Sequence, residues 1–438
     1  MTEIRDARIH DRPLLAADVA AHHTSDRLVV DLLDPDFYSS NPHDAWAWMR
    51  ANEPVYRDHR NGLWGITRHA DIMEVERRSN VFLSGQGYRA VWSPDEINMI
   101  AQDDPRHRQQ RMLVQHKFTR AEVADRRPEI DALVTELIDA IVNDAGDGRT
   151  DRTGGLVGEC ELVGAIAGQL PARLTARLLG YPEEMWREVK SWSERLMRID
   201  MRERDGHTFV EFMDANMEFM GGLGELAKDK MALAAKNGCP ADDLISVWLT
   251  AQIDGQPLPP MAIAHEVGLF ISGGAETTRT AISHGIREFC NHPEQWDALA
   301  ADPSLVPAAV EELLRWVTPL NNMFRRAAAD AIIGDTQDGT RIRRGDRIVL
   351  LYPSANRDER VFSDPFTFDI RRSPNPQIAF GFGTHLCVGN NLARATLQSL
   401  LTLMPARLRG LQVVTEPDVE PNIFARAVRS FRLGFTVR

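Results

Sequence analysis

The sequence is poor in cysteine and in long apolar runs, and each shortage excludes a class of protein. No apolar run reaches the roughly 18 residues that a membrane-spanning helix needs, and MTEIRDARIHDRPLL at the start has no apolar segment of a signal peptide. Four cysteines without CxxC spacing make neither a metal site nor a disulfide framework; they are Cys160, Cys239, Cys290 and Cys387. We therefore expect a cytoplasmic protein without a membrane anchor.

Positive charge is also in short supply. The chain carries 51 lysines and arginines against 63 aspartates and glutamates, which gives a formal net charge of −12. Nucleic-acid binding calls for a basic surface, and an anionic membrane surface would repel an acidic chain. We therefore expect neither partner.

The sequence does contain a long stretch of helical periodicity. Apolar residues recur every three to four positions from about residue 118 to 315, and HDAWAWMRAN at 43–52 predicts an earlier helix. The composition of 143–155 predicts one loop within this stretch. Helical periodicity returns in NNLARATLQSLLTLMPARL, which starts at residue 390.

Strand signals are short. Asn61-Gly62 is a turn signal between two β-type runs, RIRRGDRIVLLY at 341–352 predicts two strands around a glycine, and FRLGFTVR predicts a last strand. Neither an internal repeat nor a linker divides the sequence. We expect a mainly α fold with small β-sheets, in which a polar N-terminal segment, 1–25, precedes a single domain, 26–438.

The rare cysteine at position 387 lies in a glycine-rich run, FGFGTHLCVG, at residues 380–389. Free cysteine is often inert core packing, which is the plain explanation for Cys387. The three glycines of this run, however, allow another group to approach the backbone closely. The helix that follows would place the sulfur at a helix N-terminus, which stabilises a thiolate. One thiolate facing a flat partner suggests haem iron with cysteine as its proximal ligand.

The same run resembles the haem-binding signature of the cytochrome P450 family, Phe-x-x-Gly-x-His-x-Cys-x-Gly, with Phe380 first and Gly389 last. The resemblance implies the fold of that family and a haem b whose iron Cys387 ligates. It also implies that His385 reaches a haem propionate and that Phe380 shields the sulfur from water.

A second motif, LFISGGAETTRT, occupies residues 269–280 within a helical pattern that runs from about 261 to 290. Two adjacent glycines inside a helix cost about 1 kcal/mol each relative to alanine, and close helix packing is one explanation for them. The other is functional, because the Thr277 hydroxyl can bond the carbonyl of Gly273 and bend the helix, which opens a groove. Glu276 adds a carboxyl group for proton delivery.

This motif resembles the oxygen-binding segment of the same family. The resemblance implies that Gly273 and Gly274 make room above the haem and that Glu276 and Thr277 handle protons during O–O cleavage. Peroxide-using members usually lack the acid–alcohol pair, so its presence favours O2 as the co-substrate.

Glu312 and Arg315 share a helix face at i,i+3 spacing, and a solvated surface pair is the plain explanation. In register with the cysteine segment they resemble the ExxR element of the family. That resemblance implies a buried ion network with a downstream arginine, Arg372 in PFTFDIRR.

The segment DDPRHRQQRMLVQHKF at 103–118 places His107 and Arg111 on one helix face. It is either an ordinary basic surface helix or, as the resemblance implies, the helix that binds the haem propionates. Arg325 has the position of a third propionate contact in the family, and Arg326 could take that role instead.

Positive charge gathers in this same region. Between 104 and 120 a single acid stands against five basic residues, namely Arg106, Arg108, Arg111, Lys117 and Arg120. Because the family's helix lies near the proximal haem face, a basic patch there would steer an acidic ferredoxin. No reductase domain fits into 438 residues, so we expect electrons from separate ferredoxin and ferredoxin reductase chains.

WVTPLNNMFRR and the two motifs above are most similar to actinobacterial members of the family that oxidise steroid side chains. The resemblance implies a bulky apolar substrate, a steroid or terpenoid, whose burial gains about 0.8 kcal/mol per CH2 group. The expected substrate contacts are Tyr88, Leu269, Ser272, Leu320 and Asn321. Tyr88, Arg89 or Asn321 could hydrogen-bond a ketone, a hydroxyl or a carboxylate.

Two positions depart from the family pattern. Thr396 replaces a frequent glutamate, and Gln377 stands where histidine is common. They favour a second hypothesis, a tailoring oxygenase of diterpenoid or other natural-product biosynthesis. Our main hypothesis is an O2-dependent haem-thiolate monooxygenase that hydroxylates an unactivated C–H bond. A non-catalytic haem-thiolate sensor and a peroxygenase would also contain the cysteine motif, but the Glu276–Thr277 pair argues against the sensor.

Overall fold

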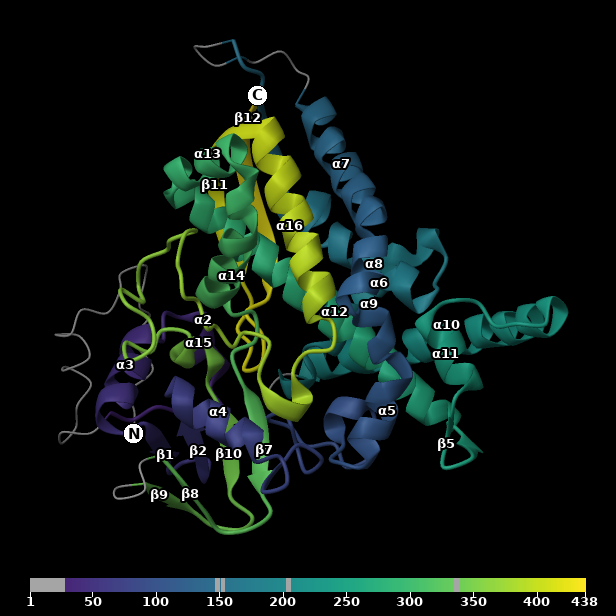
Figure 1. The fold of residues 1–438 in the computed structure, drawn as a ribbon, viewed down its shortest axis with the longest axis vertical. Helices are drawn as coiled ribbons and strands as arrows, with labels where there is room; N and C mark the ends of the chain where they lie inside the picture. The colour runs from purple at the N-terminus through teal and green to yellow at the C-terminus, as the bar shows by residue number, and fades with distance from the viewer. Residues whose placement is uncertain (1–27, 146–149, 151–153, 202–205, 335–338) are drawn as a thin grey trace.

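The computed structural model describes residues 28–145, 150, 154–201, 206–334 and 339–438. The polar segment predicted at 1–25 lies outside the described residues. Figure 1 shows a helical body with a small sheet at its lower left, and one helix, α10, that projects from its right side.

Helices dominate the described chain, as the periodicity predicts. The two longest are α10 (Gly206–Asn237) and α12 (Pro260–Asn291), with 32 residues each. The other α-helices are α2 (Pro35–Ser39), α3 (His43–Asn52), α4 (His69–Arg77), α5 (Arg106–Val114), α6 (Arg120–Asp125), α7 (Arg127–Asp144), α8 (Gln169–Leu179), α9 (Trp186–Leu196), α11 (Leu244–Thr250), α13 (Pro293–Ala301), α14 (Val306–Val317), α15 (Tyr352–Ala355) and α16 (Asn390–Arg407). Short 3-10 or π turns are η1 (Met99–Ala101), η2 (Gln115–Phe118), η3 (Val163–Ala167), η4 (Glu183–Met185), η5 (Ile199–Met201), η6 (Pro303–Leu305) and η7 (Gly383–His385).

Strands of the described chain form four small sheets. The largest has the order β1 (Val55–Asp58), β2 (Leu63–Ile66), β10 (Arg347–Leu350), β7 (Met323–Ala327) and β3 (Phe82–Leu83). The second has the order β11 (Leu408–Val419), β12 (Val428–Val437) and β4 (Val157–Glu161). The two-stranded ribbons are β5 (Gln252–Ile253) with β6 (Gln256–Pro257), and β8 (Ala331–Ile333) with β9 (Thr340–Ile342).

The predicted hairpin and the predicted pair of later strands are both present. Strands β1 and β2 pair antiparallel across the Asn61-Gly62 turn. The two strands at 341–352, however, join different sheets, because β9 pairs with β8 whereas β10 lies between β2 and β7. Gly345 turns the chain between them with a φ of 93°, a value that glycine adopts without strain.

Strand β4 is an exception to the helical prediction for 118–315. Its partner is β12, close to the end of the sequence. Because a short strand is stabilised by its cross-strand neighbours, the strand β4 depends on a partner far away in the sequence. The local periodicity of residues 157–161 therefore does not predict it.

Helix α12 takes part in both of the larger hydrophobic clusters. Its first half, with Ile263 and Ile271, packs with residues of α8, α9 and α11. Its second half, with Ile282 and Ile286, packs with residues of α14 and α16 and with the three-stranded sheet. The motif at 269–280 therefore lies where the two clusters meet.

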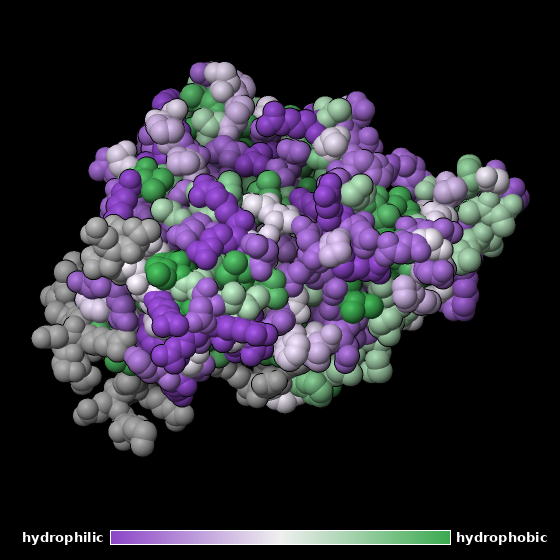
Figure 2. All heavy atoms as spheres, turned by 60° about the horizontal axis from the view of Figure 1, so that its bottom comes forward, coloured by the Kyte–Doolittle hydropathy of each residue, from purple (hydrophilic) through white to green (hydrophobic). Residues whose placement is uncertain are grey.

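The surface is mainly hydrophilic in Figure 2, and apolar residues gather along the projecting helix at the right, which is α10 by its place in Figure 1. The exposed apolar side chains of α10 are Phe209, Val210, Met213, Met217, Met220, Met231 and Leu233. None of the helices in the described part of the chain is long and apolar enough to cross a membrane.

Candidate functional site

A large cavity lies where α12, the glycine-rich run and helix α5 meet. Its volume is about 260 Å³ and its wall is mostly apolar. A water molecule takes up about 30 Å³, so the cavity can hold a ligand of many atoms. It is lined by the predicted residues Tyr88, His107, Arg111, Leu269, Ser272, Gly273, Gly274, Thr277, Leu320, Arg325, Phe380, His385, Cys387 and Gly389.

The glycine-rich run turns sharply before it reaches Cys387. Gly381 and Gly383 have φ angles of 70° and 71°, in the left-handed region. A Cβ atom at Gly383 would lie 2.5 Å from the backbone oxygen of Glu76, so only glycine fits there. The Cys387 N–H donates to the Phe380 carbonyl at 3.0 Å. The resulting loop holds the cysteine on the cavity wall, directly before α16.

Burial raises the pKa of the Cys387 thiol, and it outweighs the opposing effects of the Gly389 N–H, Arg111 and Arg394. This differs from the expectation of a thiolate stabilised by the helix start, because desolvation penalises the charged form. A metal cation bound to the sulfur would deprotonate it. The Arg394 guanidinium lies 4.6 Å from the centroid of the Phe380 ring, so the cation packs on the face of this ring.

Basic side chains from three segments gather on the cavity wall: His107 and Arg111 from α5, Arg325 from β7, and His385 from the glycine-rich run. The rings of His107 and His385 lie 4.1 Å apart between centroids. Burial lowers the pKa of both histidines, and for His385 burial together with the charge of Arg325 lowers the pKa to about 2. Arg111 forms no ion pair or side-chain hydrogen bond with the described residues. Two arginines and two neutral imidazoles, each with an N–H donor, fit a ligand that carries carboxylates.

Glu76, on α4, shares this wall and was not singled out from the sequence. Its Oε1 accepts hydrogen bonds from the Tyr352 hydroxyl at 2.7 Å and from Arg325 Nη2 at 3.3 Å. Its Oε2 is buried without a hydrogen-bond partner among the described residues. Burial raises the pKa of Glu76 against the opposing pull of Arg325 and Tyr352. The sequence does not indicate this position, because a single glutamate on an ordinary helix belongs to no recognisable motif.

The two glycines of the α12 motif serve different needs. Thr277 Oγ1 donates to the Gly273 carbonyl at 2.7 Å, and Ser272 makes the matching bond one turn earlier at 2.9 Å. A Cβ atom at Gly273 would meet nothing within 4 Å, so this position opens onto the cavity. A Cβ atom at Gly274 would lie 2.8 Å from Thr175 Oγ1 on α8, so this position allows close helix packing.

Glu276 lies outside the cavity lining, unlike its neighbour Thr277. Its carboxylate forms a buried ion pair with Arg279, which also pairs with Glu194 of α9. Burial raises the pKa of Glu276 and Arg279 lowers it. In this arrangement the Glu276 carboxylate is bound by Arg279 and does not face the cavity.

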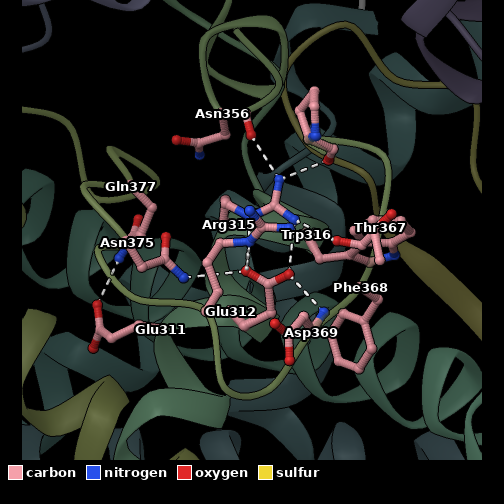
Figure 3. A network of polar contacts seen from close by, with 12 residues as sticks. Glu311, Glu312, Arg315, Trp316, Asn356, Thr367, Phe368, Asp369, Asn375 and Gln377 are labelled. Atoms are coloured by element: carbon pink, nitrogen blue, oxygen red, sulfur yellow. Dashed lines mark hydrogen bonds and ion pairs between the residues drawn. The ribbon is translucent and has the colours of Figure 1, made fainter. Parts of the chain in front are cut away.

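Glu312 and Arg315 of α14 form a buried ion pair (Figure 3), and Arg372 joins it to make a network. Arg315 Nε and Nη2 each donate to the Glu312 carboxylate at 2.7 Å, and Arg372 Nε donates to it at 3.0 Å. The side chains of Glu312 and Arg315 are 0% exposed, which excludes a solvated surface pair. Arg315 also donates to the backbone carbonyls of Asn356, Pro365 and Thr367, so it ties α14 to the loop that leads to the glycine-rich run.

The predicted polar substrate contacts are mostly engaged elsewhere. The Tyr88 hydroxyl donates to Glu96 Oε1 at 2.6 Å, although Tyr88 lines the cavity. Asn321 does not line it, because its side-chain amide donates to the backbone carbonyls of Asn422 and Ile423. In this structure the Asn321 side chain therefore ties its own segment to the chain at Asn422 and Ile423.

The basic patch predicted at 104–120 is smaller than expected. Lys117 is buried in an ion pair with Asp242, and Arg111 lines the cavity. Arg108 and Arg120 are exposed, and Arg106 is half-buried. The segment packs beside the start of α16, where the Asn391 amide donates to the Phe118 carbonyl at 2.8 Å.

Comparison with known proteins agrees with this arrangement. A family model described as Cytochrome P450 matches residues 190–427. The Steroid C26-monooxygenase of Mycobacterium tuberculosis is 36% identical over 93% of this chain and 97% of its own length. The Linalool 8-monooxygenase of Pseudomonas putida is 31% identical over 88% of this chain and 94% of its own. A Mycobacterium marinum cytochrome P450 solved in complex with pseudoionone has a TM-score of 0.79, 30% identity, and coverage of 93% of this chain and 100% of that one.

Haem-thiolate iron and O2 are the cofactor and co-substrate that this family implies, and the cavity fits them. It offers a half-buried cysteine, two arginines beside two neutral histidines, and a helix face opened by Gly273. The chain belongs to the cytochrome P450 family and is a P450 monooxygenase.

Proposed function

We propose that this P450 hydroxylates an unactivated C–H bond of a bulky apolar substrate, a steroid or a terpenoid. The observation that carries the proposal is the mostly apolar cavity of about 260 Å³, whose wall includes both Cys387 and Thr277. The relatives support the substrate class, since one is named for a steroid and another for linalool, a terpenoid alcohol.

Haem b, when bound, would supply the iron that activates O2. Cys387 would ligate that iron, and His107, Arg111, Arg325 and His385 would hold the propionates by charge-assisted hydrogen bonds. The Thr277 hydroxyl donates to a carbonyl of its own helix, so it has to exchange this bond before it can pass a proton into the cavity. The apolar wall excludes bulk water from the substrate.

A separate ferredoxin is the proposed electron donor. Arg108 and Arg120 are exposed, and their segment lies against the start of α16, close in sequence to Cys387. Cations at this place would attract an acidic partner. With two exposed arginines and the half-buried Arg106 rather than five exposed basic residues, we expect a weaker salt dependence of docking than the sequence suggests.

Reconstitution tests the proposal. The haem-loaded chain, a ferredoxin, a ferredoxin reductase and NADH are incubated with cholest-4-en-3-one or a diterpenoid, and hydroxylated products are quantified. Thr277→Ala should keep NADH consumption but lose most of the product. Thr402→Ala is the matched control, since Thr402 makes the same bond to a carbonyl four residues earlier on α16, away from the cavity.

Three outcomes would contradict the proposal. Ligand binding without product would indicate a sensor, and product with hydrogen peroxide alone would indicate a peroxygenase. Equal coupling in Thr277→Ala and Thr402→Ala would remove Thr277 from the reaction.

A further inference from the structure

The cavity wall holds a cation that the proposed mechanism does not use. Arg89, in the loop between β3 and η1, is 7% exposed and lines the cavity. Its Nη2 lies 3.8 Å from Met197 Sδ, a weak acceptor, and its Nε is buried without a hydrogen-bond partner. Arg89 forms no ion pair with any residue in the part of the chain that the structure describes.

Two aromatic rings pack against Arg89. Its guanidinium carbon lies 4.4 Å from the ring centroid of Phe424 and 5.3 Å from that of Tyr88. Met197, Phe424 and Tyr88 all line the cavity as well. Aromatic faces replace part of the lost hydration of a cation, but Nε has no acceptor among the described residues, and the guanidinium has no carboxylate in contact with it.

The nearest acids do not neutralise this guanidinium by contact. Glu96 accepts from the Tyr88 hydroxyl and from the Asn98 amide, and Asp200 accepts from the Val91 N–H. Burial acts to lower the pKa of Arg89, but Tyr88, Asp200 and Glu96 raise it. The side chain therefore stays charged, and the charge is balanced only at a distance.

We propose that Arg89 binds a carboxylate of the substrate. The substrate would then be an amphipathic acid, with a bulky hydrocarbon body and its carboxylate remote from the carbon that is hydroxylated. A buried guanidinium without an ion pair is costly, and a carboxylate accepts two parallel N–H bonds from it. A ketone oxygen would accept a hydrogen bond from Arg89 but would not neutralise the charge of the guanidinium. Of the polar groups predicted for this role, the Tyr88 hydroxyl and the Asn321 amide are engaged elsewhere.

This inference rests on the proposed function, because it concerns the substrate of the same cavity. The test is a spectral titration of the haem-loaded protein at pH 8, followed through the spin state of the iron. The ligands are two matched pairs, dehydroabietic acid and 3-oxochol-4-en-24-oic acid, each with its methyl ester. We expect at least one acid to bind roughly 10- to 100-fold more tightly than its ester, the range of a charge-assisted hydrogen bond.

Arg89→Met keeps the apolar stem of the side chain and removes the guanidinium. It should reduce the preference for the acid to less than roughly threefold and leave the affinity for the ester unchanged. Arg347→Met is the matched control, because Arg347 Nη2 donates to the Ala90 carbonyl at 2.6 Å beside the same loop but does not line the cavity. This variant should keep the preference.

Several results would overturn the inference. Equal binding of acid and ester, a preference that survives in Arg89→Met, and failure of both acids to bind each argue against a carboxylate at Arg89. None of them touches the proposed function, which would fail instead if no bound steroid or terpenoid were hydroxylated by the reconstituted system. A preference lost equally in Arg89→Met and Arg347→Met would indicate a general positive field rather than a contact.

Discussion

Replacing Glu312 with alanine should destabilise the native protein by about 3–5 kcal/mol, the usual cost of removing one partner from a buried ion pair. The Glu312 carboxylate accepts two hydrogen bonds from Arg315 and one each from Arg372 Nε, the Asp369 N–H and the Asn375 amide. Alanine leaves all these donors without that acceptor in a site shielded from water.

The remaining contacts set the size of the loss. Arg315 keeps its backbone carbonyl acceptors, and Arg372 keeps the carbonyls of Ser363, Asp364 and Thr367. Because both guanidinium groups keep hydrogen-bond acceptors, we expect the loss of unfolding free energy in Glu312→Ala to lie near the lower end of the range, at about 3 kcal/mol. This is a factor of roughly a hundred in the folding equilibrium, and a large part of a typical stability of about 5–15 kcal/mol.

The assay is the urea concentration at which half of the CO-bound thiolate-haem absorbance is lost. Glu312→Gln keeps the shape and one acceptor, and we expect it to lie between the wild type and Glu312→Ala. Glu74→Ala is the surface control, because the Glu74–Arg78 pair is partly exposed and should be worth less than about 1 kcal/mol. Equal midpoints for Glu312→Ala and Glu74→Ala would refute the reasoning.

Three further predictions concern single side chains. Cys387→Ser should abolish the CO-bound thiolate-haem band, and an unchanged band would remove Cys387 as the ligand. Glu76→Gln should retain the haem content measured by the pyridine haemochrome, whereas Glu76→Leu should lose haem because Tyr352 and Arg325 lose their acceptor; equal contents would contradict this. Burial raises the pKa of Glu266 from 4.5 to about 8, so the folded state holds this proton more tightly and stability should fall as the pH rises through that window. Glu266→Gln should flatten the dependence of the urea midpoint on pH between 5 and 8, and an unchanged slope would contradict the assignment.

Local spacing accounts for the part of the site that the sequence predicts. Thr277 bonds the carbonyl of Gly273 because the two are four residues apart on one helix. Glu312 and Arg315 meet because they are three apart on another. Such distances are fixed by the helix itself and do not depend on the rest of the fold.

Packing between distant segments accounts for what the sequence does not predict. Leu320 and Asn321 are neighbours, and a β-bridge joins Leu320 to Ala425. The Leu320 side chain lines the cavity, whereas the Asn321 side chain donates to the backbone carbonyl of Asn422. Strand β11, whose sequence LRGLQVVTEPDV mixes polar and apolar residues, is held by β12 through several register shifts. Nothing in the local pattern of either segment specifies its partner.

The adjacent residues Glu276 and Thr277 show both effects, because helix spacing fixes the contact of Thr277 and the packing of another helix fixes the contacts around Glu276. Successive residues of an α-helix point about 100° apart, so the spacing that turns Thr277 toward the cavity turns Glu276 toward α9. There Glu276 pairs with Arg279, which is held by Glu194. Helix α9 ends beside Met197, the residue in contact with Arg89. Glu276, proposed to supply protons, and Arg89, proposed to select the substrate, thus both depend on how α9 packs. The residues proposed to hold the haem lie mainly in motifs whose spacing can be read from the sequence.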